Sequence, residues 1–424
     1  MSRKAVVLLF AVLFTGVSLL SVFTFAQPVT LTVMYQNSGQ EDDLLRDWMN
    51  ENVALFEKSH QNVKFNVISN ATGDEYLTKI TAMMAAGNTP DVFQGWTLGR
   101  MEPFAKAGRL YDLSKEFKKD PKFAAFLQKE PLQSTTFNGG VYGIPATLDG
   151  EFIFYNKKVF KKLGLSKPET YEDFLRIINV CKANGIIPIA LGNKEIWIGT
   201  IPYMMLAERI GGLEAYRATV MEGTGKWTDT PFIEAGRKLQ EWIKMGAFEP
   251  DVNGIPPEEA RAKFINGKAA MYFMGTWEIA GLTSRMGVDG FGIFNLPDIK
   301  GGKGSSKHYL IIPNVAFSIG QNSQHKDVAV EFLKFIFSPE RQRKFAKLGF
   351  IPTTKVSIDP AEANPIQVEA LNAFASATGT MYPWDVPLGP ALGKELNNTT
   401  QLLYAGVSPE KALAQLERIA QSMR

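Results

Sequence analysis

The segment VTLTVMYQNSGQEDDLLRDWMNENVALFEKSHQNVKFNVI, residues 29–68, joins two β-rich runs through one helical stretch. In that stretch a mostly apolar stripe recurs at the spacing of one helix face, at Leu45, Trp48, Met49, Asn52 and Phe56. A second amphipathic helix (74–88) and a short third strand (89–96) follow. Strands that alternate with helices of this length indicate βαβ units and a mainly parallel sheet.

The same alternation continues through the rest of the chain. A strand and a short helix are predicted in EFIFYNKKVFKKLGL (151–165), and a second helix and strand follow between 166 and 192. The helix PPEEARAKFING (256–267) begins on two prolines, ends on Asn-Gly, and leads into the apolar run AAMYFMG (269–275). Because 424 residues exceed one ordinary core, the pattern predicts an α/β protein with two lobes.

The first 26 residues have the parts of a secretory signal peptide. Arg3 and Lys4 precede an uninterrupted apolar run (5–23), and small residues then fit a cleavage site after Ala26. The alternative is a retained membrane anchor, because the run approaches the length of a bilayer-spanning helix. We expect cleavage, since the turn-prone QPVT follows and no basic stop signal does. No cysteine lies near the site, which disfavours a lipid-anchored form. The protein is therefore predicted to be exported and soluble, in the periplasm or outside the cell.

The charge of the mature chain is almost balanced. Removing Arg3 and Lys4 from the 46 basic side chains leaves 44 against 43 acidic ones, a formal charge of +1. Such a balance gives no basic surface for nucleic acid. The single cysteine, Cys181, cannot form an internal disulfide and lies at an apolar position of a predicted helix. We expect it to be a buried, inert thiol.

The sequence contains no recognisable catalytic or metal-binding motif. His60, His308 and His325 do not have the spacing of a zinc-binding helix, and one cysteine cannot form a thiolate cluster. Nucleophile-elbow, phosphate-loop and dinucleotide-binding patterns are missing as well. We therefore expect no metal and no cofactor. Asp149 and Glu151 leave one enzymatic alternative, because paired carboxylates hydrolyse glycosides in many enzymes.

Four of the seven tryptophans lie where a strand or helix breaks: Trp96, Trp197, Trp277 and Trp384. Each has a polar residue close by in the sequence, at Gln94, Glu195, Glu278 and Asp385. An indole offers a flat apolar face to the C–H side of a sugar ring, while carboxylates bind its hydroxyls. The alternative for each indole is a structural role in the core, which is the commoner one. Four at such places favour a binding site for some of them.

Five segments together carry a family resemblance: MAAGNTPDVFQGW (84–96), NGGVYGIPATLDGEFIFYNKKVFKKLGL (138–165), SKPETYEDFL (166–175), FINGKAAMYFMGTWEI (264–279) and VAVEFLKFIFSPERQRKF (328–345). In this order, behind a signal peptide, they resemble the extracellular solute-binding proteins of family 1. These are the sugar-binding components of ABC importers, and maltose-binding protein is related to them. The resemblance extends over nearly all of the mature sequence.

The resemblance implies a two-lobe, type II-like periplasmic-binding-protein fold with the ligand in a cleft between lobes joined by three crossings. The first lobe would comprise 27–144 and 314–337, and the second 145–313 and 338–424. Closure of the lobes about a hinge would present a closed surface to the permease. The implied partners are a carbohydrate and the membrane permease subunits, and we expect a monomer.

Local matches to the family place ligand-binding roles on nine residues: Gln36, Ser38, Trp96, Asp149, Glu195, Trp197, Trp277, Trp384 and Asp385. Asp149, six residues before Tyr155, matches a carboxylate that accepts sugar hydroxyls, and Trp277 matches a stacking tryptophan. Two positions depart from maltose-binding protein. Ile279 replaces a second tryptophan, and residues 36–38 (Gln-Asn-Ser) replace a charged pair. We therefore expect a mono- or oligosaccharide other than a maltodextrin.

Three hypotheses follow. The first is capture of a carbohydrate without chemistry. The second is an exported hydrolase that uses Asp149 and another carboxylate, and it would release cleaved products. The third is a binder of another solute, such as an amino sugar, a polyol phosphate or ferric ion. A phosphate would need an arginine cluster in the cleft, and ferric ion would need clustered tyrosines and acids.

Overall fold

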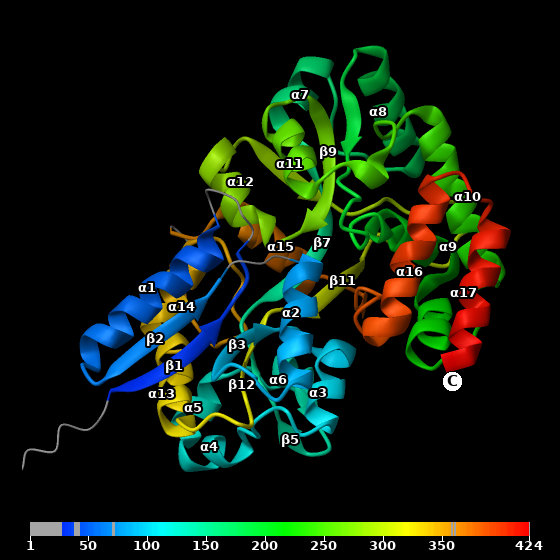
Figure 1. The fold of residues 1–424 in the computed structure, drawn as a ribbon. Coiled ribbons are helices and arrows are strands. Elements are labelled where there is room, and N and C mark those ends of the chain that lie inside the picture. Colours follow the sequence, from blue (N-terminus) through cyan, green and yellow to red (C-terminus); the bar gives the residue numbers. More distant parts are fainter. Residues whose placement is uncertain (1–27, 38–42, 70–72, 358, 360–361, 424) are drawn as a thin grey trace, which may run out of the picture.

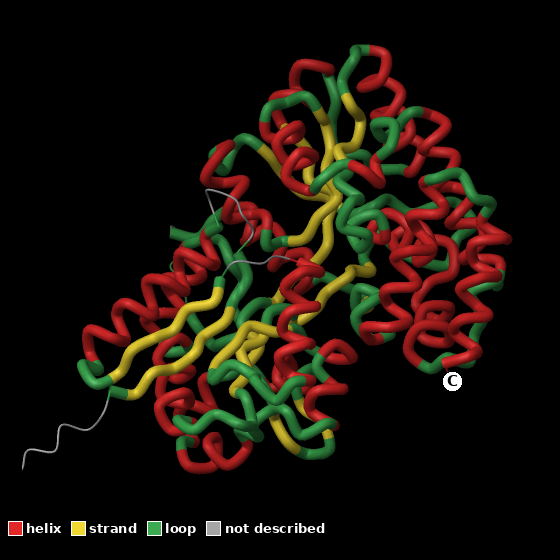
Figure 2. The backbone as a smooth tube through the Cα atoms, in the orientation of Figure 1, coloured by secondary structure: helices red, strands yellow, loops and turns green. Residues whose placement is uncertain are grey.

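The computed structural model describes residues 28–37, 43–69, 73–357, 359 and 362–423. The predicted signal peptide and Ser38 lie outside the described residues. Within them, none of the helices has the length and apolar character needed to cross a membrane. The chain forms two α/β lobes, each built around its own sheet (Figures 1 and 2).

The first lobe contains a five-stranded sheet in the order β2–β1–β3–β12–β6. β1 pairs in parallel with β2 and β3, as the sequence predicts, whereas β12 runs antiparallel to β3 and β6. Its strands are β1 (Val29–Met34), β2 (Val63–Ile68), β3 (Val92–Gly95), β6 (Ile144–Pro145) and β12 (Ala316–Ile319), with a separate hairpin of β4 (Thr136–Phe137) and β5 (Gly140–Val141). Its helices are α1 (Leu44–Ser59), α2 (Gly73–Ala85), η1 (Leu98–Arg100), α3 (Glu102–Lys106), α4 (Ser114–Lys119), α5 (Pro121–Phe126), α6 (Lys129–Gln133) and α13 (Lys326–Ile336).

Helices cover both faces of this sheet. Successive residues of a strand point to opposite faces, and β1 follows this rule. Val33 joins the core formed with α1 and α13, whereas Met34 joins the core formed with α2. The continuous apolar character of β1 therefore reflects burial on both sides.

The second lobe contains a mixed sheet in the order β13–β11–β7–β9–β8, with β10 also paired to β7. β7 runs antiparallel to β9, β10 and β11, so the mainly parallel arrangement expected from the alternating pattern holds for β1–β3 and not here. Its strands are β7 (Leu148–Asn156), β8 (Ile187–Ala190), β9 (Ala269–Gly275), β10 (Phe291–Phe294), β11 (His308–Pro313) and β13 (Gly379–Met381).

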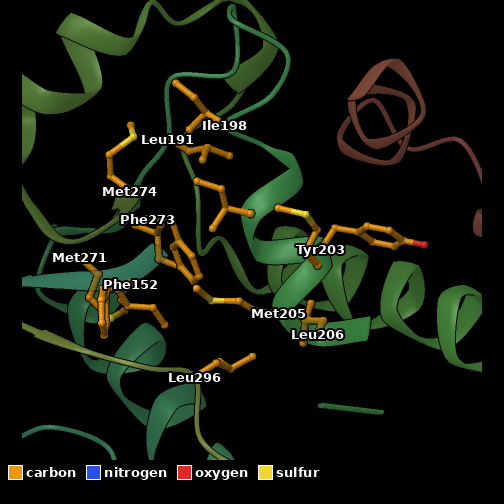
Figure 3. Packing of buried hydrophobic residues seen from close by; sticks show 14 of the residues in the cluster. Phe152, Leu191, Ile198, Tyr203, Met205, Leu206, Met271, Phe273, Met274 and Leu296 are labelled. Carbon is orange, nitrogen blue, oxygen red and sulfur yellow. The ribbon is translucent and has the colours of Figure 1, made fainter. Parts of the chain in front are cut away.

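The described residues of the second lobe form eleven helical segments: α7 (Lys157–Leu163), α8 (Tyr171–Ala183), α9 (Thr200–Tyr216), η2 (Arg217–Met221), α10 (Thr230–Met245), η3 (Val252–Gly254), α11 (Pro257–Ile265), α12 (Glu278–Met286), α15 (Pro365–Ala375), α16 (Gly389–Tyr404) and α17 (Pro409–Met423). One large apolar core joins them to the sheet. Figure 3 shows part of it, where side chains of β7 and β9 meet those of α9. Cys181 is buried there, and burial raises the pKa of its thiol to about 11.

Three segments of backbone cross between the lobes and hydrogen-bond to one another. The β6–β7 connection is tied to the β11–β12 connection by Ala146 N–H donating to the Val315 carbonyl (2.6 Å). It is tied on its other side by Leu148 N–H donating to the Ile351 carbonyl (2.8 Å). The three crossings implied by the family resemblance are thus present, and they lie side by side.

The helix α14 (Pro339–Lys347) lies against the first lobe, next to α1 (Figure 1). The rings of Trp48 and Phe345 are 4.6 Å apart, and Arg341 Nε donates to Asn52 Oδ1 (2.6 Å). Phe345 belongs to the same core as α1 and α13. We therefore propose that the third crossing lies near 351–353 instead of at 337/338, which moves α14 to the first lobe.

Replacing Phe345 with alanine tests this assignment. Phe345→Ala removes a ring that packs on both Trp48 and Phe350, so the free energy of unfolding should fall by about 3 kcal/mol. Chemical denaturation followed by circular dichroism measures the loss. The control is Arg343→Ala, which changes an exposed residue of the same helix. Equal losses in the two variants would contradict the packing of α14 on α1.

Candidate functional site

A cavity of about 340 Å³ lies between the two lobes. The first lobe contributes the loops after β1 and β3 and the start of α2, and the second contributes β7, the loops after β8 and β9, and residues 383–386. Seven of the nine residues predicted as ligand contacts line it, namely Gln36, Trp96, Asp149, Glu195, Trp197, Trp277 and Asp385.

Two indoles form an aromatic corner on the second-lobe side. Trp277 and Trp197 are both half-buried, and their rings are 5.8 Å apart at an angle of 59°. The indole of Trp277 folds back over Gly275, where an added Cβ would lie 2.1 Å from ring atom Cζ3. Gly275 therefore does more than end the strand, because only a residue without a side chain leaves room for this ring.

Trp96 presents a third indole from the first lobe. It makes an edge contact with Tyr76 (5.8 Å between ring centres), and the Arg100 guanidinium lies 5.6 Å from its ring centre. Nearby, Gln36 N–H donates to Gln94 Oε1 (3.1 Å), which fixes the end of β1 against β3. The cavity therefore has indoles on both of its sides.

Asp149 lies at the start of β7, and each of its two carboxylate oxygens accepts a hydrogen bond from a threonine. Thr147 Oγ1 donates to Oδ2 (2.7 Å) and Thr276 Oγ1 donates to Oδ1 (2.9 Å). Burial raises the pKa of Asp149, and the hydrogen bonds to its carboxylate oppose that shift. A carboxylate has about four acceptor positions, so these two bonds orient Asp149 and leave capacity for a ligand hydroxyl.

Glu195 lies between the lobes. It accepts a hydrogen bond from Trp197 Nε1 (3.2 Å), and a Cβ built on Gly73 would be only 2.9 Å from its Oε2. Gly73 begins α2 of the first lobe, and a carboxylate is stabilised at a helix N-terminus. Glu195 therefore contributes to contact between the lobes as well as to the cavity wall.

Asp385 is bound to Arg100 across the cleft. Arg100 Nη2 lies 2.8 Å from Asp385 Oδ2, and Asn397 Nδ2 donates to the same oxygen (3.2 Å). Arg100 was not predicted from the sequence, although it comes only four residues after Trp96. A second missed pair, Arg261 and Glu278 (2.7 Å), also lines the cavity.

The structure places Trp384 in the core of the second lobe instead of at the cavity. Its side chain is 1% exposed and contacts four other aromatic rings, those of Tyr203, Tyr216, Trp227 and Phe232. Trp384 does follow the end of a strand, as predicted, but its indole points into the core, and it is the neighbouring Asp385 that lines the cavity. Ser38 lies outside the described residues.

The sequence profile of the bacterial extracellular solute-binding proteins matches residues 42–343 of the chain. The chain belongs to this family. Among curated relatives of this solute-binding protein, the multiple sugar-binding protein of Streptococcus mutans is 24% identical over 84% of the chain and 81% of the relative. The diacetylchitobiose-binding protein of Streptomyces coelicolor is 25% identical over 92% of this chain and 88% of the relative.

Two solved structures are similar in both fold and sequence. One, from a study of xylan utilization by the thermophilic bacterium Caldanaerobius polysaccharolyticus, has a TM-score of 0.85 and 29% identity, covering 92% of this chain and 99% of the other. The second, a chitin oligosaccharide binding protein, has a TM-score of 0.85 and 27% identity, covering 93% and 98%. The two-lobe fold of the solute-binding protein therefore agrees with both.

The close approach of Gly275 and Trp277 can be tested by adding one methyl group. Gly275→Ala places a Cβ 2.1 Å from an atom of the indole ring, so the ring must move, and the overpacking should lower stability by about 2 kcal/mol. Tryptophan fluorescence should shift as the ring leaves its position. The control is Gly254→Ala, whose added Cβ has no atom within 4 Å. An unshifted spectrum and unchanged stability for Gly275→Ala would refute this account of the corner.

Proposed function

We propose that this solute-binding protein captures a carbohydrate in the interlobe cavity and delivers it to an ABC importer without altering it. The observation that carries the proposal is the aromatic corner of Trp197 and Trp277, which faces carboxylates inside one cavity. Indole faces bind the apolar side of a sugar ring, and carboxylates bind its hydroxyls.

The named relatives support a sugar as the ligand. Their names and titles mention multiple sugars, diacetylchitobiose, chitin oligosaccharides and xylan. These differ in sugar and linkage, so the relatives support the class of ligand more than any one compound. Ile279, the position from which a ligand other than a maltodextrin was expected, is buried in the second-lobe core and is not among the residues that line the cavity, so it gives that expectation no further support.

Export and the transporter partner complete the proposal. We infer that residues 1–26 act as a cleaved signal peptide, and that a monomer then meets the membrane permease subunits. Closure of the lobes around the sugar is the change that the permease would recognise. Binding is favoured over hydrolysis because the matching family and the named relatives are solute-binding proteins.

Removing the indole of Trp277 tests the proposed site. Titration calorimetry first identifies a ligand among xylo-oligosaccharides, N-acetylchito-oligosaccharides, raffinose and maltose. Trp277→Ala should then weaken binding of that sugar at least tenfold, about 1.4 kcal/mol, because the stacking surface is lost. Chromatography of the incubated sugar should show no shortened products.

The matched control changes a tryptophan that does not line the cavity. Trp384→Phe should lower the melting temperature, because the indole fills the second-lobe core, and leave the affinity within about twofold. The proposed site is wrong if Trp277→Ala binds as tightly as the parent protein. Shortened oligosaccharides would instead favour the hydrolase.

A further inference from the structure

Glu151 is a buried carboxyl group that the proposed binding site does not yet use. It lies two residues after Asp149 on β7, so both side chains point to the same face of the strand and both line the cavity. The side chain is 3% exposed. Among the described residues, its Oε2 has no hydrogen-bond partner.

An unpaired buried oxygen of this kind is costly. A carboxyl that loses water and gains no partner destabilises the folded state. Burial is the main cause that raises the pKa of Glu151 well above its ordinary value, and the negative charge of Asp385 adds to it. Burial therefore favours the neutral form of this carboxyl, which has one O–H donor as well as acceptor positions.

The charges around the cavity are unequal. Among the described residues of the lining, two are basic, and both are in ion pairs, Arg100 with Asp385 and Arg261 with Glu278. The same lining carries seven carboxyl groups, on Asp43, Asp149, Glu151, Glu195, Glu258, Glu278 and Asp385. The arginine cluster that a phosphate or carboxylate ligand needs is therefore missing from this part of the lining.

We propose that Glu151 is a further ligand-binding residue whose free carboxyl oxygen bonds a hydroxyl of an uncharged sugar, and that the surrounding carboxyl groups exclude acidic sugars. This inference rests on the proposed carbohydrate site. A sugar hydroxyl is both donor and acceptor, so it matches a neutral carboxyl whichever oxygen carries the proton. A carboxylate or phosphate on the ligand would be repelled inside a cavity where charges are poorly screened.

Two substitutions separate a binding role from a structural one. Glu151→Leu removes the hydrogen-bonding group, so it should weaken binding of the neutral sugar about tenfold. Its melting temperature without sugar should equal or exceed that of the parent, because an unpaired buried carboxyl is gone. Glu151→Gln keeps a neutral group that donates and accepts, so its affinity should stay within about threefold.

The matched control is Glu417→Gln, a glutamate that is 6% exposed and bound to Trp227 N–H away from the cavity. Its affinity for the sugar should equal that of the parent. The inference is overturned if Glu151→Leu binds as tightly as the parent. It is also overturned if Glu151→Gln loses as much affinity as Glu151→Leu, because an ionised carboxylate would then be the binding group.

A ligand panel tests the charge selection with the parent protein. Calorimetry compares neutral xylo-, cello- and N-acetylchito-oligosaccharides with anionic oligogalacturonides and cationic chitosan oligosaccharides. We expect the tightest binding within the neutral set. Tighter binding of either charged set overturns the inference while leaving a carbohydrate site in place. If no sugar of any charge binds, the proposed function itself fails, which is a different result.

Discussion

The backbone hydrogen bonds among residues 146–148, 314–315 and 351–353 tie the two lobes together at one narrow place. Each lobe has its own core, apart from Ala280 of α12, which packs into the core of the first lobe. Three adjacent connections restrict the relative motion of the lobes to a few backbone torsions. Side chains from separate parts of the chain therefore return to the same positions whenever the lobes approach, which is what a cavity shared by both lobes requires.

Within that frame, the cavity combines two kinds of surface that rarely occur together in a core. Indoles at strand ends supply flat apolar faces, and carboxyl groups beside them supply polar contacts. The carboxyl groups are oriented by the protein's own donors, as Thr147 and Thr276 orient Asp149. Preorganised groups of this kind lose little freedom when a ligand binds, which favours affinity.

The sequence was sufficient to predict site residues whose position depends on their neighbours along the chain. Trp277 could be placed at the cavity because it directly follows a buried strand, whereas Asp149 was placed there by the family resemblance. The same reasoning failed for Trp384, whose local pattern is similar, because its burial depends on Tyr203 and Trp227 far away in the sequence. Arg100 was missed for the same reason, since its partner lies 285 residues further on.

The lobe to which α14 belongs could not be read from the local sequence either. The sequence of α14 does not say which lobe buries this helix, and the boundary at 337/338 came from the family resemblance. Only the path of the third crossing decides between the lobes. Packing between residues that are distant in the sequence therefore supports the proposed lobe of α14 and sets the direction of the Trp384 side chain.

The ion pair between Arg100 and Asp385 has a consequence for how the receptor signals its state. Both partners belong to the protein, so the bond favours the approach of the lobes whether or not a solute occupies the cavity. A contact of this kind shifts the equilibrium toward the approached form and raises apparent affinity, because a larger fraction of molecules is already competent. The same shift increases the number of empty receptors that resemble loaded ones. A stronger ion pair therefore improves capture of a scarce solute, but it also increases the fraction of empty receptors that bind the importer.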